Sequence, residues 1–408
     1  MQERSKTISL CIVIGIILIC SLVLAGEQKN EEILVNDNTT FAIKLYQKLC
    51  DSDDNIFFSP YSISTALSMT YAGARGNTRK EMAKALRFTL DRDNLHATFA
   101  IIESKLSKIQ KAGNVKLNVV NNLWPQKDYR ILDEYLSLIK KHYGVSITPV
   151  DYIQATEVSR KMINKWVEEK TQDKIKDIIQ SGMIDPLTRL VLVNSIYFKG
   201  NWKKKFKKSR TKDAPFYVSL NKSVKTPMMT QKQRFRYAEF RTLKILALPY
   251  AGNELSMIVL LPNKDVGLKQ LEGNLTVENL RRWTDRLRER KLLVSLPKFK
   301  TTSMFKLDKT LISMGMVDAF NDDRANFAGI NGSPKGLFIK PLVHKAFIVV
   351  NEYGTEAAAA TAVVMKTKSI PYIPVFRADR PFIFLIQENK TRNILFMGRM
   401  NDPTKTGE

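Results

Sequence analysis

Residues 352–369 have the sequence Glu-Tyr-Gly-Thr-Glu-Ala-Ala-Ala-Ala-Thr-Ala-Val-Val-Met-Lys-Thr-Lys-Ser. The odd positions of this stretch are uncharged, and they are Thr355, Ala357, Ala359, Thr361, Val363 and Met365. The charged Glu356 and Lys366 both fall on even positions. Because side chains alternate between the two faces of a β-strand, the segment can form a strand with one face free of charge.

The same stretch is also compatible with a surface helix. Alanine is the best helix former and a poor strand former, so the run of small residues after Gly354 is not tied to one conformation. In the helical alternative Thr355 is the N-cap, and Pro371 and Pro374 stop the helix. In either case the stretch ends in a basic, polar tip at residues 366–369, which suits a protease that cuts after lysine.

Six further blocks of sequence bear on the choice between these alternatives, because they indicate the family to which the stretch belongs. They are residues 57–67 (Phe-Phe-Ser-Pro-Tyr-Ser-Ile-Ser-Thr-Ala-Leu), 194–202 (Asn-Ser-Ile-Tyr-Phe-Lys-Gly-Asn-Trp), 227–229 (Pro-Met-Met), 341–352 (Pro-Leu-Val-His-Lys-Ala-Phe-Ile-Val-Val-Asn-Glu), 378–386 (Ala-Asp-Arg-Pro-Phe-Ile-Phe-Leu-Ile) and 394–399 (Ile-Leu-Phe-Met-Gly-Arg). In this order, together with residues 352–361, they resemble the serpins from about Thr40 to Pro403. The resemblance implies an α+β fold with mainly antiparallel sheets, a helical layer and an exposed reactive-centre loop at about 352–374. It also implies one domain over residues 26–408.

Local patterns agree with an α+β chain. Ser59 followed by Pro60 predicts a helix over 62–72, and the spacing of Thr78 and Glu81 predicts a capping box for the next helix. Residues 277–291 are expected to be helical, with Leu280, Trp283 and Leu287 facing inward. Buried strands or hairpins are predicted at 190–198, 245–250 with 255–261, and 382–386 with 394–397.

The resemblance implies a suicide-substrate mechanism. The target protease cleaves the loop and forms an acyl-enzyme, and the loop then inserts into the main sheet as a new strand. An inserting hinge needs small residues, no proline and no charge on its buried face. The hinge predicted here meets these demands and consists of Glu352, Gly354, Thr355, Glu356, Ala357, Ala358, Ala359, Ala360 and Thr361. We therefore expect an inhibitor; the alternative is a non-inhibitory serpin that acts as a carrier, a chaperone or a glycosaminoglycan-bound protein.

The cleaved bond is predicted to be Lys368–Ser369, because its distance from Glu352 matches the family's spacing. Lys366 is the alternative. A lysine at this point suits trypsin-like serine proteases, whose primary pocket carries an acidic residue. Catalysis by the chain itself is not expected, since it has only three histidines (His96, His142 and His344) and no hydrolase elbow, zinc helix or phosphate loop. No catalytic residue, metal or cofactor is predicted.

Further positions acquire structural roles from the resemblance. Ser59, Ser62, Asn194 and His344 match a polar cluster beneath the point where the main sheet opens, and Trp202 matches a tryptophan at the top of that sheet. Glu352 and Lys298 match an ion pair at the base of the loop. A buried hydrogen-bonded network of this kind can hold a sheet closed and still allow it to reorganise.

Residues 1–25 have the pattern of a secretory signal, with a positive start, an apolar run and small residues before Gly26. An uncleaved signal anchor is the alternative. We therefore expect a secreted, extracellular protein that does not contact the membrane after cleavage. Beyond residue 25 Cys50 is the only cysteine, which excludes an internal disulfide there. Five sequons, which are possible glycosylation sites, occur at Asn38, Asn221, Asn274, Asn331 and Asn389, with Asn389 expected to be the best exposed.

The net charge is +25. Two basic clusters stand out, one with Lys203, Lys204, Lys205, Lys207 and Lys208, the other with Arg281, Arg282, Arg286 and Arg290. In the predicted helix Arg282, Arg286 and Arg290 share a face. Heparin-like glycosaminoglycans are a candidate partner, and the alternative is a solvated basic surface. Nucleic acid is not expected because no recognition motif accompanies the charge. The chain is expected to be a monomer.

Overall fold

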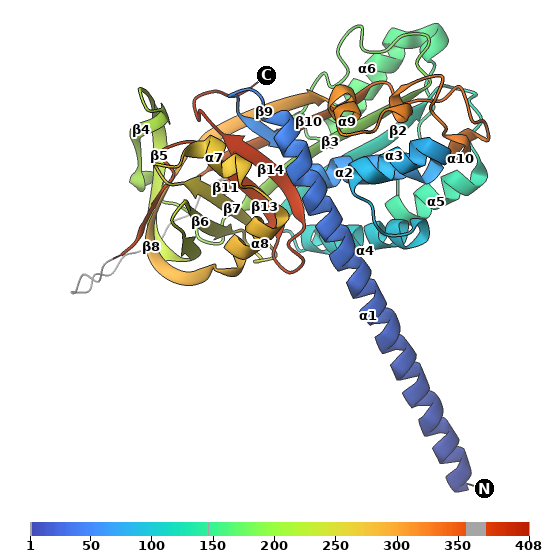
Figure 1. Ribbon diagram of the computed structural model, residues 1–408, viewed down its shortest axis with the longest axis horizontal. Coiled ribbons are helices and arrows are strands. Elements are labelled where there is room, and N and C mark those ends of the chain that lie inside the picture. The colour runs from blue at the N-terminus through green and yellow to red at the C-terminus, as the bar shows by residue number, and fades with distance from the viewer. Residues whose placement is uncertain (1, 146, 356–372, 408) are drawn as a thin grey trace.

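The computed structural model describes residues 2–145, 147–355 and 373–407; the side chains of residues up to 24 and of 118–120 are not described. Its helices are α1 (Gln2–Leu49), α2 (Pro60–Gly73), α3 (Gly76–Leu86), α4 (Arg92–Lys111), α5 (Asp133–Tyr143), α6 (Tyr152–Lys170), α7 (Gly267–Gly273), α8 (Val277–Asp285), α9 (Asp308–Ser313) and α10 (Ala328–Asn331). Figure 1 shows α2–α6 and α10 gathered at one end of the molecule and most strands at the other. The N-terminal part of α1 projects away from both.

Most strands belong to a nine-stranded sheet with the order β1-β14-β13-β7-β6-β5-β8-β12, and β4 pairs with β5 off this path. Its strands are β1 (Ile56–Phe58), β4 (Thr211–Ser219), β5 (Lys222–Glu239), β6 (Leu243–Pro249), β7 (Leu255–Pro262), β8 (Arg288–Pro297), β12 (Val375–Arg377), β13 (Phe382–Glu388) and β14 (Ile394–Met400). The strands β7, β13 and β14 are buried almost throughout. The buried hairpins predicted from their continuous apolar runs are therefore confirmed.

The second sheet has five strands in the order β2-β3-β11-β10-β9. They are β2 (Val115–Pro125), β3 (Leu190–Asn201), β9 (Phe299–Lys306), β10 (Leu342–Asn351) and the two-residue β11 (Gly354–Thr355). The strands β3 and β10 pair directly and in parallel over residues 192–197 and 342–347. At the other end of the sheet β11 lies between them. The prediction of an α+β fold with mainly antiparallel sheets is confirmed.

The start of α2 follows from its sequence. Ser59 has extended backbone geometry and its hydroxyl accepts the backbone N–H of Ser62, while Pro60 occupies the first turn, as predicted. The capping box predicted at Thr78 is wrong. The helix α3 begins at Gly76, and the Thr78 hydroxyl accepts a distant backbone N–H, that of Asn326.

The helix predicted over 277–291 is wrong in its second half. The helix α8 ends at Asp285, and β8 begins at Arg288. The alternation of Leu292, Val294 and Leu296 places these buried side chains on the sheet's inner face, and pairing with β5 satisfies the backbone. Leu280, Trp283 and Leu287 are buried as expected, but Arg282, Arg286 and Arg290 do not share a helical face.

The helix α1 continues without a break through Ala25 and Gly26, where cleavage was expected. Its C-terminal part is held by buried residues such as Leu34, Phe41 and Tyr46, and the Tyr46 hydroxyl donates to Glu272 at 2.6 Å. Within the part of the chain whose side chains are described, no helix is both long and apolar enough to span a membrane.

Candidate functional site

The first residues of the predicted hinge are seated in the five-stranded sheet. Gly354 and Thr355 form antiparallel pairs with Asn201 and Gly200 of β3 on one side and with β10 on the other. The Thr355 side chain is completely buried. Gly354 has a φ of +152°, and a Cβ there would overlap the carbonyl oxygen of Gly200, so this position requires glycine. The remaining hinge residues, Glu356 to Thr361, and the bond Lys368–Ser369 lie outside the described residues.

Two aromatic side chains cover the seated hinge. Trp202 stacks on Tyr250 with 4.8 Å between ring centroids and 14° between ring planes. The Trp202 indole nitrogen donates to the carbonyl oxygen of Asn351 at 2.9 Å, and the Tyr250 hydroxyl bonds the Thr355 hydroxyl at 2.9 Å. Burial raises the pKa of Tyr250, which therefore remains a neutral phenol. Trp202 thus contacts the end of β10, and Tyr250 contacts the hinge itself.

The base of the hinge is fixed by Glu352. Its carboxylate lies 3.1 Å from the ammonium of Lys298, which confirms the predicted ion pair, and accepts the Thr211 hydroxyl at 2.8 Å. Burial acts to raise the pKa of Glu352. Hydrogen bonds from the backbone, Thr211 and Lys298 outweigh this effect, so its pKa is lowered and the carboxylate stays ionised.

The four residues predicted as a polar cluster are joined in one buried network, located where β3 and β10 pair directly. The backbone N–H of Ser59 donates to Nε2 of His344 at 3.0 Å, so the imidazole carries its proton on Nδ1 and donates it to Oδ1 of Asn194. The Asn194 amide donates in turn to the Ser62 hydroxyl at 2.6 Å. Burial lowers the pKa of His344 to about 3, so the histidine is neutral. Trp202 is not part of this network.

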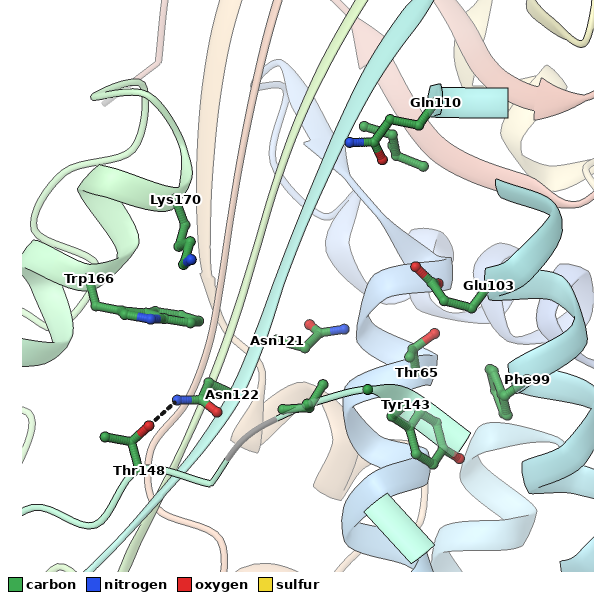
Figure 2. Close-up of a pocket in the computed structure, with 13 residues that line it drawn as sticks. Thr65, Phe99, Glu103, Gln110, Asn121, Asn122, Tyr143, Thr148, Trp166 and Lys170 are labelled. Atoms are coloured by element: carbon green, nitrogen blue, oxygen red, sulfur yellow. Dashed lines mark hydrogen bonds between the residues drawn. The ribbon is translucent and has the colours of Figure 1, made fainter. Parts of the chain in front are cut away.

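A fifth member, Asn121 of β2, was not predicted. Its Oδ1 accepts hydrogen bonds from Asn194 and from the Ser62 hydroxyl. Its neighbour Asn122 points to the opposite side of β2, toward Thr148 and Trp166, as Figure 2 shows. The two amides border a cavity of about 530 Å³ around the edge of β2. Asn121 and Asn122 are adjacent in a strand, and adjacent side chains point to opposite faces of the sheet. This was the only sequence signal that the two amides have different surroundings.

The structure brings together part of the two basic clusters at two adjoining hollows, whereas Lys205, Lys207, Lys208 and Arg281 do not line either hollow. One hollow is lined by Lys203, Lys204, Arg234, Arg236 and Arg288, and an adjoining hollow of about 1140 Å³ by Arg234, Arg282, Arg286, Arg288, Arg290 and Lys291. Arg234 and Arg288 belong to both hollows. The second hollow is also lined by Pro374. We call these residues the basic tract; Arg234 and Arg236 in it were not predicted.

Two of the five sequons lie on buried asparagines. Asn38 is 2% exposed and its Oδ1 accepts the Ser64 hydroxyl, and buried Asn331 donates to the Tyr129 hydroxyl. Asn389 is half-buried and donates to the carbonyl oxygen of Asn253, so the expectation that it is the best exposed is wrong. Asn221 and Asn274 are exposed.

Known proteins share this arrangement. The family model described as "Serpin (serine protease inhibitor)" matches residues 36–403. The chain is 41% identical to leukocyte elastase inhibitor A of Rattus norvegicus over 382 residues, which cover 91% of this chain and 100% of the relative. It is 42% identical to serpin B6 of Macaca fascicularis with the same coverage. The crystal structure of uncleaved ovalbumin matches with a TM-score of 0.79 and 34% identity, over 91% of this chain and all of the other.

The fold and the site define a protein whose five-stranded sheet holds the short strand β11 between β3 and β10. With a family model matched over most of its length, the chain belongs to the serpin family of serine protease inhibitors. Its inhibitory relatives are substrates that are consumed by the proteases they inhibit, and they are not enzymes.

The prediction of a secreted, extracellular protein is wrong. The relatives are leukocyte elastase inhibitors and serpin B6, and serpins of this group are intracellular. In the structure α1 runs unbroken from Gln2 to Leu49, through the point where cleavage was expected. The apolar run at residues 8–24 has the same sequence pattern whether it is a cleaved signal or the start of a longer helix, so sequence alone did not separate the two.

Proposed function

We propose that this serpin is an inhibitor of trypsin-like serine proteases and that it traps them as acyl-enzymes after cleavage at Lys368–Ser369. The observation that carries the proposal is the seated hinge. The pairs made by Gly354 and Thr355 with β3 and β10 are the first two steps of a new central strand. In a strand that continued past Thr355 every second residue would share its face, and residues 357, 359, 361, 363 and 365, which lie outside the described residues, are uncharged.

The environment of Thr355 explains why an uncharged face matters. The side chain lies under Tyr250 with no access to solvent, and it can be accommodated because it is small and its hydroxyl has a partner. A residue that enters the sheet on this face leaves water, and an unpaired charge there costs several kcal/mol. A loop of Thr and Ala meets this condition, which favours inhibition over a carrier role.

Trypsin tests the proposal. We expect a detergent-stable complex on a denaturing gel and a released C-terminal peptide that begins at Ser369. Lys368→Ala should slow complex formation with trypsin by at least about 100-fold, because the acidic primary pocket loses its partner. Lys366→Ala is the matched control and should react at nearly the wild-type rate.

Three outcomes would contradict this assignment. A peptide that begins at Thr367 would move the bait residue to Lys366. Clean cleavage without a complex would favour a non-inhibitory serpin. A chain resistant to trypsin that nonetheless traps an elastase-like protease would remove the trypsin-like specificity, and leukocyte elastase inhibitors among the relatives make this comparison necessary.

We propose further that the basic tract binds a linear polyanion of the heparin type. Its support is the convergence of Lys203, Lys204, Arg234, Arg288 and Arg290 on adjoining hollows. We expect heparin binding to weaken steeply as salt rises, because the charges are accessible to ions. The double variant Arg234→Gln/Arg288→Gln should lose about tenfold in affinity.

Lys165→Gln/Lys161→Gln is the control for this experiment. It removes the same charge from exposed positions on α6, away from the basic tract. Equal losses in both double variants would reduce the interaction to net charge, and binding that persists unchanged at high salt would contradict an electrostatic site.

A further inference from the structure

A second group of cations lies apart from the basic tract, where α3, α4 and the end of α2 meet. The Arg79 guanidinium lies 5.6 Å from the ring centroid of Tyr71, and its Nε donates to the Tyr71 hydroxyl at 3.4 Å. The Tyr71 ring lies 6.5 Å from that of His96. Arg92 precedes His96 by four residues on α4, so the two share a helix face. Arg75 lies just before α3, and its guanidinium donates to the carbonyl oxygens of Ala72 at 3.0 Å and Ala74 at 2.9 Å.

Two nitrogens in this group lack partners. His96 is 1% exposed, and its Nδ1 lies 2.6 Å from the Tyr143 hydroxyl. Among the described residues, Nε2 of His96 and Nε of Arg92 have no hydrogen-bond partner although both atoms are closed to solvent. Buried polar groups are nearly always paired, and leaving one unpaired costs about 1–3 kcal/mol. Two such atoms one helical turn apart indicate a missing acceptor.

Within the part of the chain that the structure describes, no carboxylate pairs with the positive charge of the group, because Arg75, Arg79 and Arg92 form no ion pair there. Burial lowers the pKa of Arg75, and Arg92 and Arg79 lower it further, while exposed Glu134 acts in the opposite direction. Burial, followed by Arg92, His142 and Arg79, lowers the pKa of His96 to about 3. The arginines are therefore close enough to repel one another.

We propose that Arg79, Arg92 and His96 form a binding site for a small multivalent oxyanion, phosphate or sulfate. A tetrahedral oxyanion has only acceptors, and guanidinium groups bind it through charge-assisted hydrogen bonds. When the Tyr143 hydroxyl donates to Nδ1 of neutral His96, the imidazole proton is on Nε2 and is directed to such a ligand. The proposal does not depend on the inhibitory mechanism.

The position of the site suggests what the bound anion does. The Tyr143 hydroxyl also bonds the Ser68 hydroxyl of α2 at 2.8 Å, so His96 is connected through Tyr143 to the helix that carries Ser59 and Ser62. Figure 2 shows Tyr143 beside Thr65 of the same helix. An anion held by α3 and α4 therefore stabilises the packing of α4 and α5 on α2.

The three histidines provide the test. The full chain is labelled at histidine, and inorganic phosphate replaces chloride at constant ionic strength while the imidazole NMR signals are recorded; sulfate is titrated in parallel. We expect the signals of His96 and its neighbour His142, whose ring centroids lie 6.3 Å apart, to shift with saturation at millimolar anion. His344 lies in the polar network between β3 and β10 and should not respond.

Arginine variants distinguish binding at the proposed site from a nonspecific effect of the protein's positive charge. Arg92→Gln and Arg79→Gln should each weaken saturation at least tenfold, whereas Arg241→Gln, an exposed arginine between β5 and β6, should leave it unchanged. If Arg92→Gln does not fold, Arg79→Gln decides. Saturation by either anion that depends on these arginines supports the site. Shifts that do not saturate, or equal weakening in Arg241→Gln, would overturn it.

Discussion

Thr355→Arg is expected to leave the reactive-centre loop cleavable by trypsin while abolishing the covalent complex. Thr355 is fully buried between β3 and β10 with its hydroxyl on Tyr250. A guanidinium at this point has no acidic partner, and burying it costs several kcal/mol. Insertion would then be slower than hydrolysis of the acyl-enzyme by orders of magnitude, and the chain would be consumed as an ordinary substrate.

The measurement is the number of inhibitor molecules consumed per protease trapped, from a denaturing gel and residual trypsin activity. Thr355→Ser is the matched control, because it keeps the hydroxyl and adds no volume, and it should trap nearly as well as the wild type. An undiminished complex in Thr355→Arg would show that this position need not enter the sheet, and the insertion argument would be lost.

Asn194→Ala should destabilise the folded protein by about 3–5 kcal/mol. The Asn194 amide accepts from His344 and donates to both Ser62 and Asn121, so its removal leaves the buried Nδ1–H of His344 without a partner. Each unsatisfied buried group costs about 1–3 kcal/mol, and networks exceed the sum of their pairs. Urea unfolding followed by tryptophan fluorescence measures the loss.

Asn122→Ala provides the comparison. The Asn122 side-chain amide lies on the neighbouring strand β2 and donates one hydrogen bond, to the Thr148 hydroxyl at 3.2 Å. We expect about 1 kcal/mol there. If both variants lose a similar free energy of unfolding, the network around His344 stabilises the sheet no more than a single hydrogen bond does.

Strand periodicity predicted the burial of Thr355, whereas the hinge residues 356–361 lie outside the described residues and stay a prediction. The alternation of uncharged residues from Thr355 onward required a buried face, and Thr355 is buried. The extent of insertion was not predictable, because it depends on the competition between β3–β10 pairing and the incoming strand. Tyr250 was missed for a related reason, since nothing near it in sequence indicates that its hydroxyl contacts the hinge.

The errors have a common physical origin in local ambiguity. Arginine-rich residues after Asp285 suit a helix by propensity, but pairing with β5 made them a strand. Two separate basic clusters were predicted, and tertiary structure brings Lys203 and Lys204 of one and Arg282, Arg286 and Arg290 of the other to adjoining hollows that share Arg234. Asn121 and Asn122 are the same residue type, and only the strand's orientation assigns one of them to the His344 network.

The direct pairing of β3 with β10 has one more consequence. These strands run parallel, whereas β11 is antiparallel to both. Each residue added to β11 therefore exchanges one parallel ladder for two antiparallel ladders, and parallel pairing is slightly the less stable per residue. In its present form the sheet has only the two-residue β11 where a full-length strand between β3 and β10 would lie. Backbone hydrogen bonding alone therefore favours a longer β11, whatever the side chains of the loop contribute.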